Sequence, residues 1–386
     1  MKIGLYVTQA MYQPAGFDMV SAHVQIPLYT ARILKDLGHD ITLITTEANI
    51  DRRLPDSLVS VDGIKIKTVT CASRQWPKAE IYPLKSVKQF KEIRKLINSS
   101  KFDVINFFGG NKMGYLLGLL KVCGIKTPAF MTFINFFKPH TRLQKALCAR
   151  LLSNINYIIA LTEYTKTQII DIGLDEAQVK IIKPGIVKQI SNINTESKLL
   201  KSLKPYILFW RNANWANGAD ICAEVFKILS CSYPNFNFVY AVRLGDQYEN
   251  ELLNTAKMYK NIHLLKYPYD DNLRIIDLIS ASFFVILPFR QLSINPQFAV
   301  LETLACGTPL ITTPIESNQE IITDNKNGIF ISNSINEIVA KVKFILDNPS
   351  YLDGIGINGK LSVEKDWNWS VYTKELISYY NSSLTN

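Results

Sequence analysis

Glu302 is the residue whose surroundings most suggest a chemical role. The segment FAVLETLA, residues 298–305, is apolar apart from Glu302 and Thr303. A carboxylate within such a segment must find partners, because burying a charge alone is costly. An arginine or lysine of the same fold would make a structural ion pair with it. A sugar diol would satisfy the same carboxylate, so the segment by itself leaves both interpretations open.

The segments around Glu302 predict a strand, a loop, a helix and a second strand. Phe283–Leu287 is a short apolar run of the kind buried in parallel sheets. Asn295-Pro296 is typical of a helix start, Gly307 of a helix end, and Pro309–Thr313 of the next strand. Loops after parallel strands lie where α/β proteins bind ligands. The free amides and the dipole at a helix start suit a phosphate.

A family resemblance makes this more specific. VLETLACGTPLITT, followed by Glu320 and Asn327-Gly328, resembles the donor-binding segment of glycosyltransferase family 4, also called group 1. The resemblance implies an α/β protein with the GT-B fold, in which two Rossmann-like domains with parallel sheets face an interdomain cleft. Glu302 matches the second glutamate of the family pattern, which holds the ribose of a sugar nucleotide.

The resemblance also implies that the start of this helix binds the donor, and the sequence departs from the pattern there. The first family glutamate falls at Ile294, and the family Gly-Gly pair is replaced near Glu316-Ser317. In the family, the first glutamate is usually assigned to the transferred sugar or to stabilising charge in the transition state. The residues of the helix start to which the resemblance assigns donor binding are Asn295, Pro296, Gln297 and Phe298.

Arg211 is the residue that best suits the donor diphosphate. It follows the predicted strand Tyr206–Trp210 and matches the arginine of the family pattern G-R-x-x-x-x-K-G. A planar guanidinium can bind two phosphate oxygens at once. Asn217 stands at the lysine position, so one positive charge is missing; Arg243 and Arg290 are two candidates to replace it. The resemblance gives catalytic roles to Arg211 and Glu302, and assigns Asn217 to the donor site.

The N-terminal segment resembles the opening of the same family. Lys2–Thr8 is a predicted strand, Ser21–Gly38 a predicted helix and His39–Thr45 the next strand. The resemblance brings Gly16, in the first loop, to the donor phosphates and the acceptor; an ordinary turn glycine is the alternative. His23 is better interpreted as a packed or capping residue than as a catalyst.

Repeated strand and helix units predict two mainly parallel sheets. The predicted domains are residues 1–189 on the acceptor side, a linker at 190–204, a nucleotide-sugar domain at 205–368, and a C-terminal helix at 369–386 that packs back on the first domain. The other predicted strands are Ile64–Val69, Val104–Phe108, Ala129–Phe133, Tyr157–Leu161, Val179–Ile182, Phe236–Val242, Ile262–Tyr267 and Gly328–Ile331.

Composition narrows the possible partners. The net charge of +10 has two interpretations: the protein binds an acidic partner, or the charge only keeps the protein soluble. Nucleic acid is not expected, because no recognition motif is present. The six cysteines show no metal-binding spacing, and no DxD motif follows a strand, so neither a metal nor another cofactor is expected. No signal peptide or bilayer-spanning run is seen, which predicts a cytoplasmic protein.

The acceptor side contains a basic amphipathic stretch. FFKPHTRLQKALCAR, residues 136–150, mixes lysines and arginines with apolar residues. Such a helix can lie on an anionic membrane, here the inner face of the cell membrane, or present a solvated face to water. In the first case the acceptor is a lipid-linked sugar, and His140 is a candidate to position it.

These observations predict a retaining hexosyltransferase. It would move a sugar from a nucleotide-diphosphate donor to a hydroxyl of a glycan or lipid-linked acceptor, as in polysaccharide biosynthesis. A noncatalytic GT-B scaffold for another transferase is the alternative, suggested by the missing glutamate and lysine. A sugar-nucleotide epimerase is a second alternative, but the additional acid/base residues that such an enzyme needs are not evident in this sequence. A dinucleotide oxidoreductase is disfavoured, because no G-x-G-x-x-G follows the first strand.

Overall fold

The structure, a computed structural model, consists of two compact units. One unit is Met1–Pro184 together with Trp369–Asn386, and the other is Gly185–Asn368. The residues described are 1–7, 22–46, 63–70, 82–186, 193–194, 197–242, 247–267, 269–270 and 273–385, without the side chains of 22–24 and 82–85.

The first unit contains a seven-stranded sheet in the order β3-β2-β1-β4-β5-β6-β7. All of its neighbouring strands pair in parallel. The strands are β1 (Lys2–Val7), β2 (Asp40–Thr46), β3 (Lys65–Val69), β4 (Val104–Gly109), β5 (Ala129–Phe133), β6 (Tyr157–Ala160) and β7 (Val179–Ile181).

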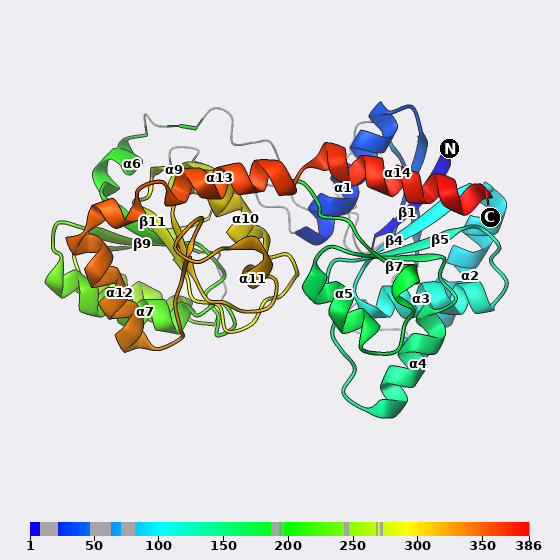
Figure 1. Ribbon diagram of the computed structural model, residues 1–386, viewed down its shortest axis with the longest axis horizontal. Coiled ribbons are helices and arrows are strands. Elements are labelled where there is room, and N and C mark those ends of the chain that lie inside the picture. The colour runs from blue at the N-terminus through cyan, green and yellow to red at the C-terminus, as the bar shows by residue number, and fades with distance from the viewer. Residues whose placement is uncertain are drawn as a thin grey trace. The chain divides into compact units, whose positions relative to one another are not determined.

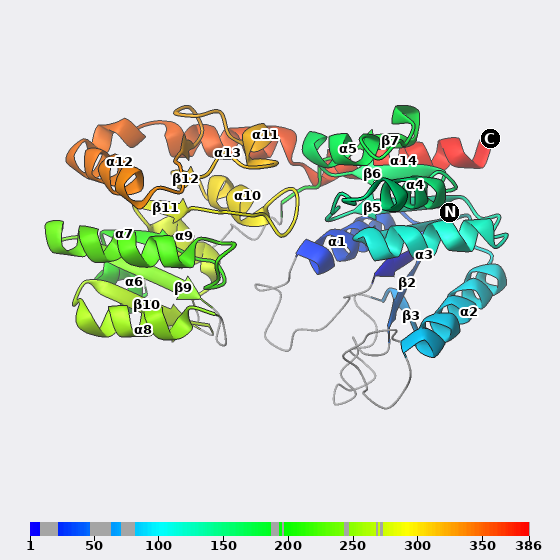
Figure 2. The ribbon, with the colours of Figure 1, turned by 90° about the horizontal axis from the view of Figure 1, so that it is seen from below.

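Helices cover both faces of this sheet (Figure 1, Figure 2). Helices α1 and α14 lie on one face, and α2, α3 and α4 on the other. The helices of this unit are α1 (Ala22–Asp36), α2 (Tyr82–Ser100), α3 (Asn111–Val122), α4 (Arg142–Leu152), α5 (Glu163–Ile170) and α14 (Trp369–Thr385).

The second unit contains a six-stranded parallel sheet in the order β10-β9-β8-β11-β12-β13. The order reverses direction between β8 and β11, so the loops that follow these two strands are neighbours at one edge of the sheet. The strands are β8 (Tyr206–Phe209), β9 (Asn237–Val242), β10 (Ile262–Lys266), β11 (Phe284–Leu287), β12 (Leu310–Thr312) and β13 (Ile329–Phe330).

Helices again lie on both faces, with α7 and α12 on one side and α9, α10 and α13 on the other (Figure 1). The helices of this unit are α6 (Lys198–Leu203), α7 (Ala219–Ser232), α8 (Glu249–Met258), α9 (Ile275–Ala281), α10 (Phe298–Ala305), α11 (Asn318–Ile321), α12 (Ile335–Asp347) and α13 (Ile355–Asp366).

The predicted strands are confirmed, because the apolar runs of the sequence are the buried strands. Strands β4, β8 and β11 are buried at every position. A strand covered by helices on both faces has no solvated side and therefore reads as a continuous apolar run.

The structure differs from the predicted linker at residues 190–204, because α6 lies inside it. Leu200 and Leu203 of α6 are buried in the hydrophobic core of the second unit. Lys201 and Ser202 lie between these two leucines and make the segment look polar in the sequence. Part of the polar segment is therefore an element of the second unit rather than a free connection.

Candidate functional site

Helix α10 places Glu302 as predicted, within an apolar helix of the second unit. Every residue of α10 is buried except Glu302, which is half-buried. The helix therefore contributes one partly accessible carboxylate to the edge of a closed hydrophobic core.

The predicted start of this helix is wrong by two residues. The helix begins at Phe298, with Gln297 as its N-cap, and the peptide bond between Asn295 and Pro296 is cis. The Asn295 side chain does not cap the helix, because it is used between two loops: its Oδ1 accepts from the Ser317 amide at 3.2 Å. Asn295 and Pro296 thus belong to the loop before α10.

Glu316 makes the other half of this contact between loops. Its Oε2 accepts from Asn295 Nδ2 at 2.7 Å, and its Oε1 accepts from the Leu292 amide at 3.3 Å. Its φ of +46° is uncommon for a residue with a side chain. The carboxylate comes from the loop after β12 and reaches the loop before α10, where buried Ile294 stands at the family glutamate position.

Glu316 is the site residue that sequence reasoning missed. Its position appeared only as a departure from a glycine pair. A carboxylate in the loop that follows a buried strand was the signal that could have identified it, because such loops meet at the ligand-binding edge of a parallel sheet.

Three buried side chains next to this contact have polar atoms that lack hydrogen-bond partners among the described residues. They are both ends of the Gln297 amide, the Ser317 hydroxyl and the Asn318 carbonyl oxygen. All three residues are fully buried. An unsatisfied buried polar group costs about 1–3 kcal/mol, so a cluster of them suits a polar ligand or ordered water.

Arg211 lies at the same edge of the sheet as Glu302. The residue before it, Trp210, donates from Nε1 to the Oγ1 of Thr303 at 3.2 Å, and Thr303 follows Glu302 on α10. The Arg211 guanidinium carbon lies 6.0 Å from the centroid of the Trp210 ring. The structure therefore places Arg211 and Glu302 next to two residues that are bonded to each other.

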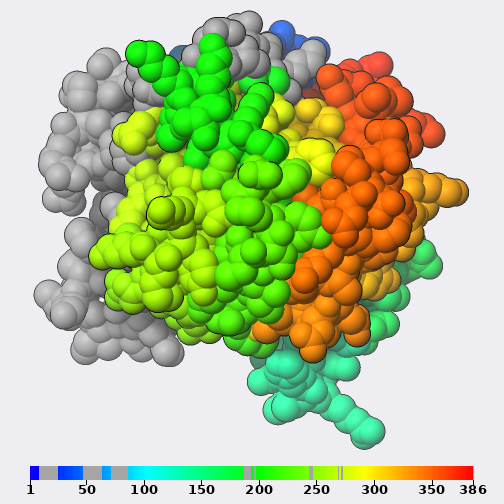
Figure 3. Space-filling model, turned by 90° about the vertical axis from the view of Figure 1, so that its left-hand side faces the viewer, coloured from blue at the N-terminus to red at the C-terminus, as the bar shows by residue number. Residues whose placement is uncertain are grey.

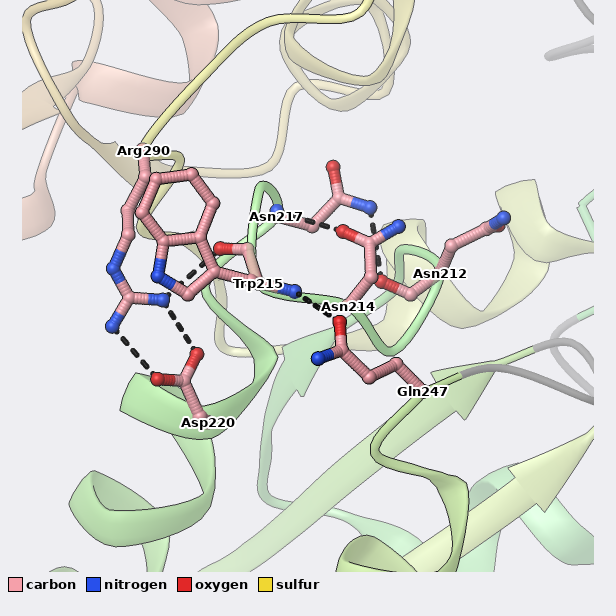
Figure 4. Close-up of polar contacts among 7 residues, drawn as sticks. All are labelled: Asn212, Asn214, Trp215, Asn217, Asp220, Gln247 and Arg290. Carbon is pink, nitrogen blue, oxygen red and sulfur yellow. Dashed lines mark hydrogen bonds and ion pairs between the residues drawn. The ribbon is translucent and has the colours of Figure 1, made fainter.

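Asn217 closes the turn after β8 rather than presenting its amide outward (Figure 4). Its Nδ2 donates to the Asn212 carbonyl at 2.9 Å, and its backbone amide donates to Asn214 Oδ1 at 3.0 Å. Gly218 follows in the left-handed region, with φ of +71°. The amide that replaces the family lysine is thus a structural group of the loop.

Arg290 does not supply the missing charge of that lysine, because its guanidinium binds Asp220. The two groups form a bidentate ion pair at 2.6 and 2.7 Å (Figure 4). Burial opposes ionisation of Asp220, but the hydrogen bonds and charge of Arg290 lower the pKa of its carboxyl. Arg290 also lies 5.2 Å from the Trp215 ring and donates to the Trp215 carbonyl at 3.0 Å.

Comparison with known families matches both units. A sequence model of the family described as "Glycosyl transferases group 1" matches residues 191–362, and one described as "Glycosyltransferase Family 4" matches residues 27–189. The chain belongs to the group 1, family 4-like glycosyltransferases. As a GT-B glycosyltransferase it contains two Rossmann-like domains, and the polar cluster described above lies in the part matched by the group 1 model.

Individual relatives are distant in sequence and similar in fold. An uncharacterized glycosyltransferase of Methanocaldococcus jannaschii is 22% identical over 324 residues, which covers 78% of this chain and 82% of the relative. A crystal structure of a glycosyltransferase from Rickettsia africae has a TM-score of 0.77 at 15% identity and covers 100% of this chain and 99% of that one. Anabaena HepE in complex with UDP has a TM-score of 0.75 at 13% identity, with 99% and 100% covered.

The remaining predicted residues of this glycosyltransferase lie elsewhere. Gly16 and Arg243 are outside the described residues, as is the side chain of His23. His140 is exposed in the first unit, just before α4. Among the described residues, no three His, Cys, Asp or Glu side chains are grouped so that they could hold a metal ion.

Proposed function

We propose that this glycosyltransferase is a retaining hexosyltransferase that uses a nucleotide-diphosphate sugar and a hydroxyl acceptor on a glycan or lipid-linked sugar. The observation that carries the proposal is the fully buried Gln297, whose amide lacks partners among the described residues, at the start of the helix that carries Glu302. A related fold, HepE, was crystallised with UDP and with UDP-glucose. A nucleotide sugar would supply hydrogen-bond partners for the unpaired polar atoms of Gln297, Ser317 and Asn318.

In this proposal each residue binds the part of the donor that suits its chemistry. The Arg211 guanidinium and the free amides at the start of α10 bind the diphosphate, because both present positive charge to oxygens. Glu302 accepts hydrogen bonds from the ribose hydroxyls. Glu316, with two acceptor positions still available on its carboxylate, accepts from hydroxyls of the transferred sugar.

The proposed reaction depends on positioning and electrostatics. The bond between the anomeric carbon and the diphosphate oxygen breaks, and the acceptor oxygen bonds to the same face of the sugar. The hydroxyl proton passes to the departing diphosphate. Arg211 stabilises the negative charge that develops on this leaving group.

A panel of UDP-, GDP- and ADP-sugars tests the proposal. Release of nucleoside diphosphate is measured for the wild type, Glu302→Ala and Arg211→Ala, with Glu364→Ala and Arg94→Ala as exposed controls of matched type. We expect one donor class to react, with kcat/KM lower by at least about tenfold in the two site variants, since each loses a charged contact to the donor. If no donor binds or reacts, the noncatalytic scaffold replaces this proposal.

A further inference from the structure

One continuous stretch of the first unit has an unusual charge pattern. Residues 104–162 contain seven lysines and arginines and no aspartate or glutamate. The stretch forms β4, α3, β5, α4 and β6. The charged side chains that this stretch contributes to the first unit are therefore all positive.

The same stretch exposes large apolar side chains. Leu143 is 80% exposed, Leu147 59% and Phe137 57%. Leu143 and Leu147 are one helical turn apart on α4, and Arg150 follows at the next turn of the same face. Phe137 precedes the helix, with exposed His140 between them. Positive charge and apolar area thus occur on one surface.

Helix α4 is held at its C-terminal end and projects at its N-terminal end. Only Cys148 and Leu152 of its residues are buried. A side-chain carbon on Gly118 of α3 would lie 2.3 Å from the Leu151 carbonyl oxygen, so the backbones of the two helices are in close contact there. The opposite half of α4 stands away from the rest of its unit (Figure 1), and atoms of this part of the chain are coloured blue-green in Figure 3.

The projecting end is well ordered by its own hydrogen bonds. Thr141 Oγ1 accepts from the Gln144 amide at 3.2 Å, and the Thr141 amide donates to Gln144 Oε1 at 3.3 Å, which makes a capping box. Lys138 is fixed by Asp171 at 2.6 Å, and the hydrogen bond and charge of Lys138 lower the pKa of the Asp171 carboxyl. The leucines are therefore presented by a formed helix.

We propose that the surface made by Phe137, Arg142, Leu143, Leu147 and Arg150 docks on an anionic lipid bilayer. The apolar side chains enter the boundary between headgroups and acyl chains, and the arginines bind lipid phosphates. The positive charge of residues 104–162 favours a negatively charged partner, and the exposed leucines favour a partner with an apolar interior. A polyanion such as nucleic acid has the negative charge but no apolar interior. The surface belongs to the first unit, so the proposal does not depend on the donor site.

Flotation with lipid vesicles tests this docking surface. The full chain is mixed with phosphatidylcholine vesicles that contain either no anionic lipid or about 30% phosphatidylglycerol, at low and high salt. Three double variants are compared with the wild type. Arg142→Glu/Arg150→Glu reverses the two positive charges of the surface, and Leu143→Ser/Leu147→Ser removes the apolar contact. Ile357→Ser/Leu361→Ser on α13 is the matched control. These two apolar side chains are 67% and 57% exposed and are also four residues apart, but the charged residues near them in the sequence are of both signs.

We expect the wild type to bind the anionic vesicles and to dissociate at high salt. Each α4 variant should partition at least about tenfold less, while the α13 control stays within about twofold of the wild type. Equal binding to neutral vesicles, or wild-type partitioning of either α4 variant, would overturn the proposal. Binding to a DNA duplex that does not depend on the leucines, without vesicle binding, would instead identify a simple polyanion surface.

Discussion

At the scale of single residues, the loss of the first family glutamate is accompanied by a new carboxylate contact. Ile294 is buried and apolar, so it cannot bind a hydroxyl. Glu316 reaches the same loop from the next strand end, at 2.7 Å from Asn295 Nδ2. A side chain held at φ of +46° costs free energy that a glycine would not. We interpret this backbone strain as a consequence of holding the Glu316 carboxylate in its proposed position at the donor sugar.

Replacing Glu316 separates a role toward the sugar from a structural role. In Glu316→Gln we expect turnover of the reacting donor to fall about tenfold, because an amide is a weaker acceptor than a carboxylate. Affinity for the nucleoside diphosphate alone should stay within about threefold. Initial rates and calorimetric titration measure the two quantities.

Two further variants complete this test. Glu316→Gly removes the carboxylate and relieves the positive φ, so its melting temperature should not fall by much while its turnover does. Glu364→Gln on α13 is the exposed control. Unchanged turnover in Glu316→Gln, or parallel losses of turnover and nucleotide affinity, would show that Glu316 only ties the loops together.

At the scale of elements, the turn after β8 and the loop after β11 are packed backbone to backbone. A side-chain carbon on Gly218 would lie 2.1 Å from the Pro288 carbonyl oxygen. The Arg290 amide donates to the Ala216 carbonyl at 2.9 Å across the same contact. These two loops carry Arg211 and the residues before α10, so their close approach fixes the proposed phosphate site.

Gly218→Ala should therefore be severely destabilising. We expect a loss of about 3 kcal/mol in the free energy of unfolding, from the positive φ together with overlap against backbone that cannot move aside. Gly354→Ala is the control, because its φ is +79° but its nearest atom, in Asn358, lies 3.9 Å away. That variant should lose only about 1 kcal/mol. Urea denaturation measures both, and equal losses would contradict the argument from close approach.

At the scale of the whole molecule, the last helix of the chain completes the first unit. Tyr372, Leu376 and Tyr380 of α14 are buried, although their neighbours in sequence, up to Asn368, belong to the second unit. Asn106 Nδ2 on β4 donates to the Tyr380 hydroxyl at 2.8 Å, and its Oδ1 accepts from Thr132 Oγ1 at 3.1 Å. A buried polar network thus joins residues 274 positions apart.

Removing the Tyr380 hydroxyl should destabilise one unit and not the other. Tyr380→Phe leaves the Asn106 amide with an unsatisfied donor, for which we expect a loss of about 1–3 kcal/mol. Amide hydrogen exchange should show faster exchange in β4 and β5 and no change in β8 and β11. Tyr379→Phe, whose ring packs 5.5 Å from that of Tyr157, should change neither unit by more than about 0.5 kcal/mol. Faster exchange in both units would contradict the division.

No helix among the described residues is both long and apolar enough to cross a bilayer. The membrane contact proposed for α4 is made by a surface of the first unit. It would bring a lipid-linked acceptor to the unit that the sequence assigns to the acceptor side.

The sequence alone determined the strands, most helices, the family and the position of Glu302 on its helix. These follow from local apolar patterns and from residues close together in the chain, which one helix or strand keeps in fixed register. Only the tertiary structure decided which polar groups meet. Three contacts join elements that follow different strands. They are the hydrogen bond between Glu316 and Asn295, the ion pair between Arg290 and Asp220, and the hydrogen bond between Trp210 and Thr303. Which residues become partners depends on which loops the strand order of the sheet brings together, and no local sequence pattern specifies that order.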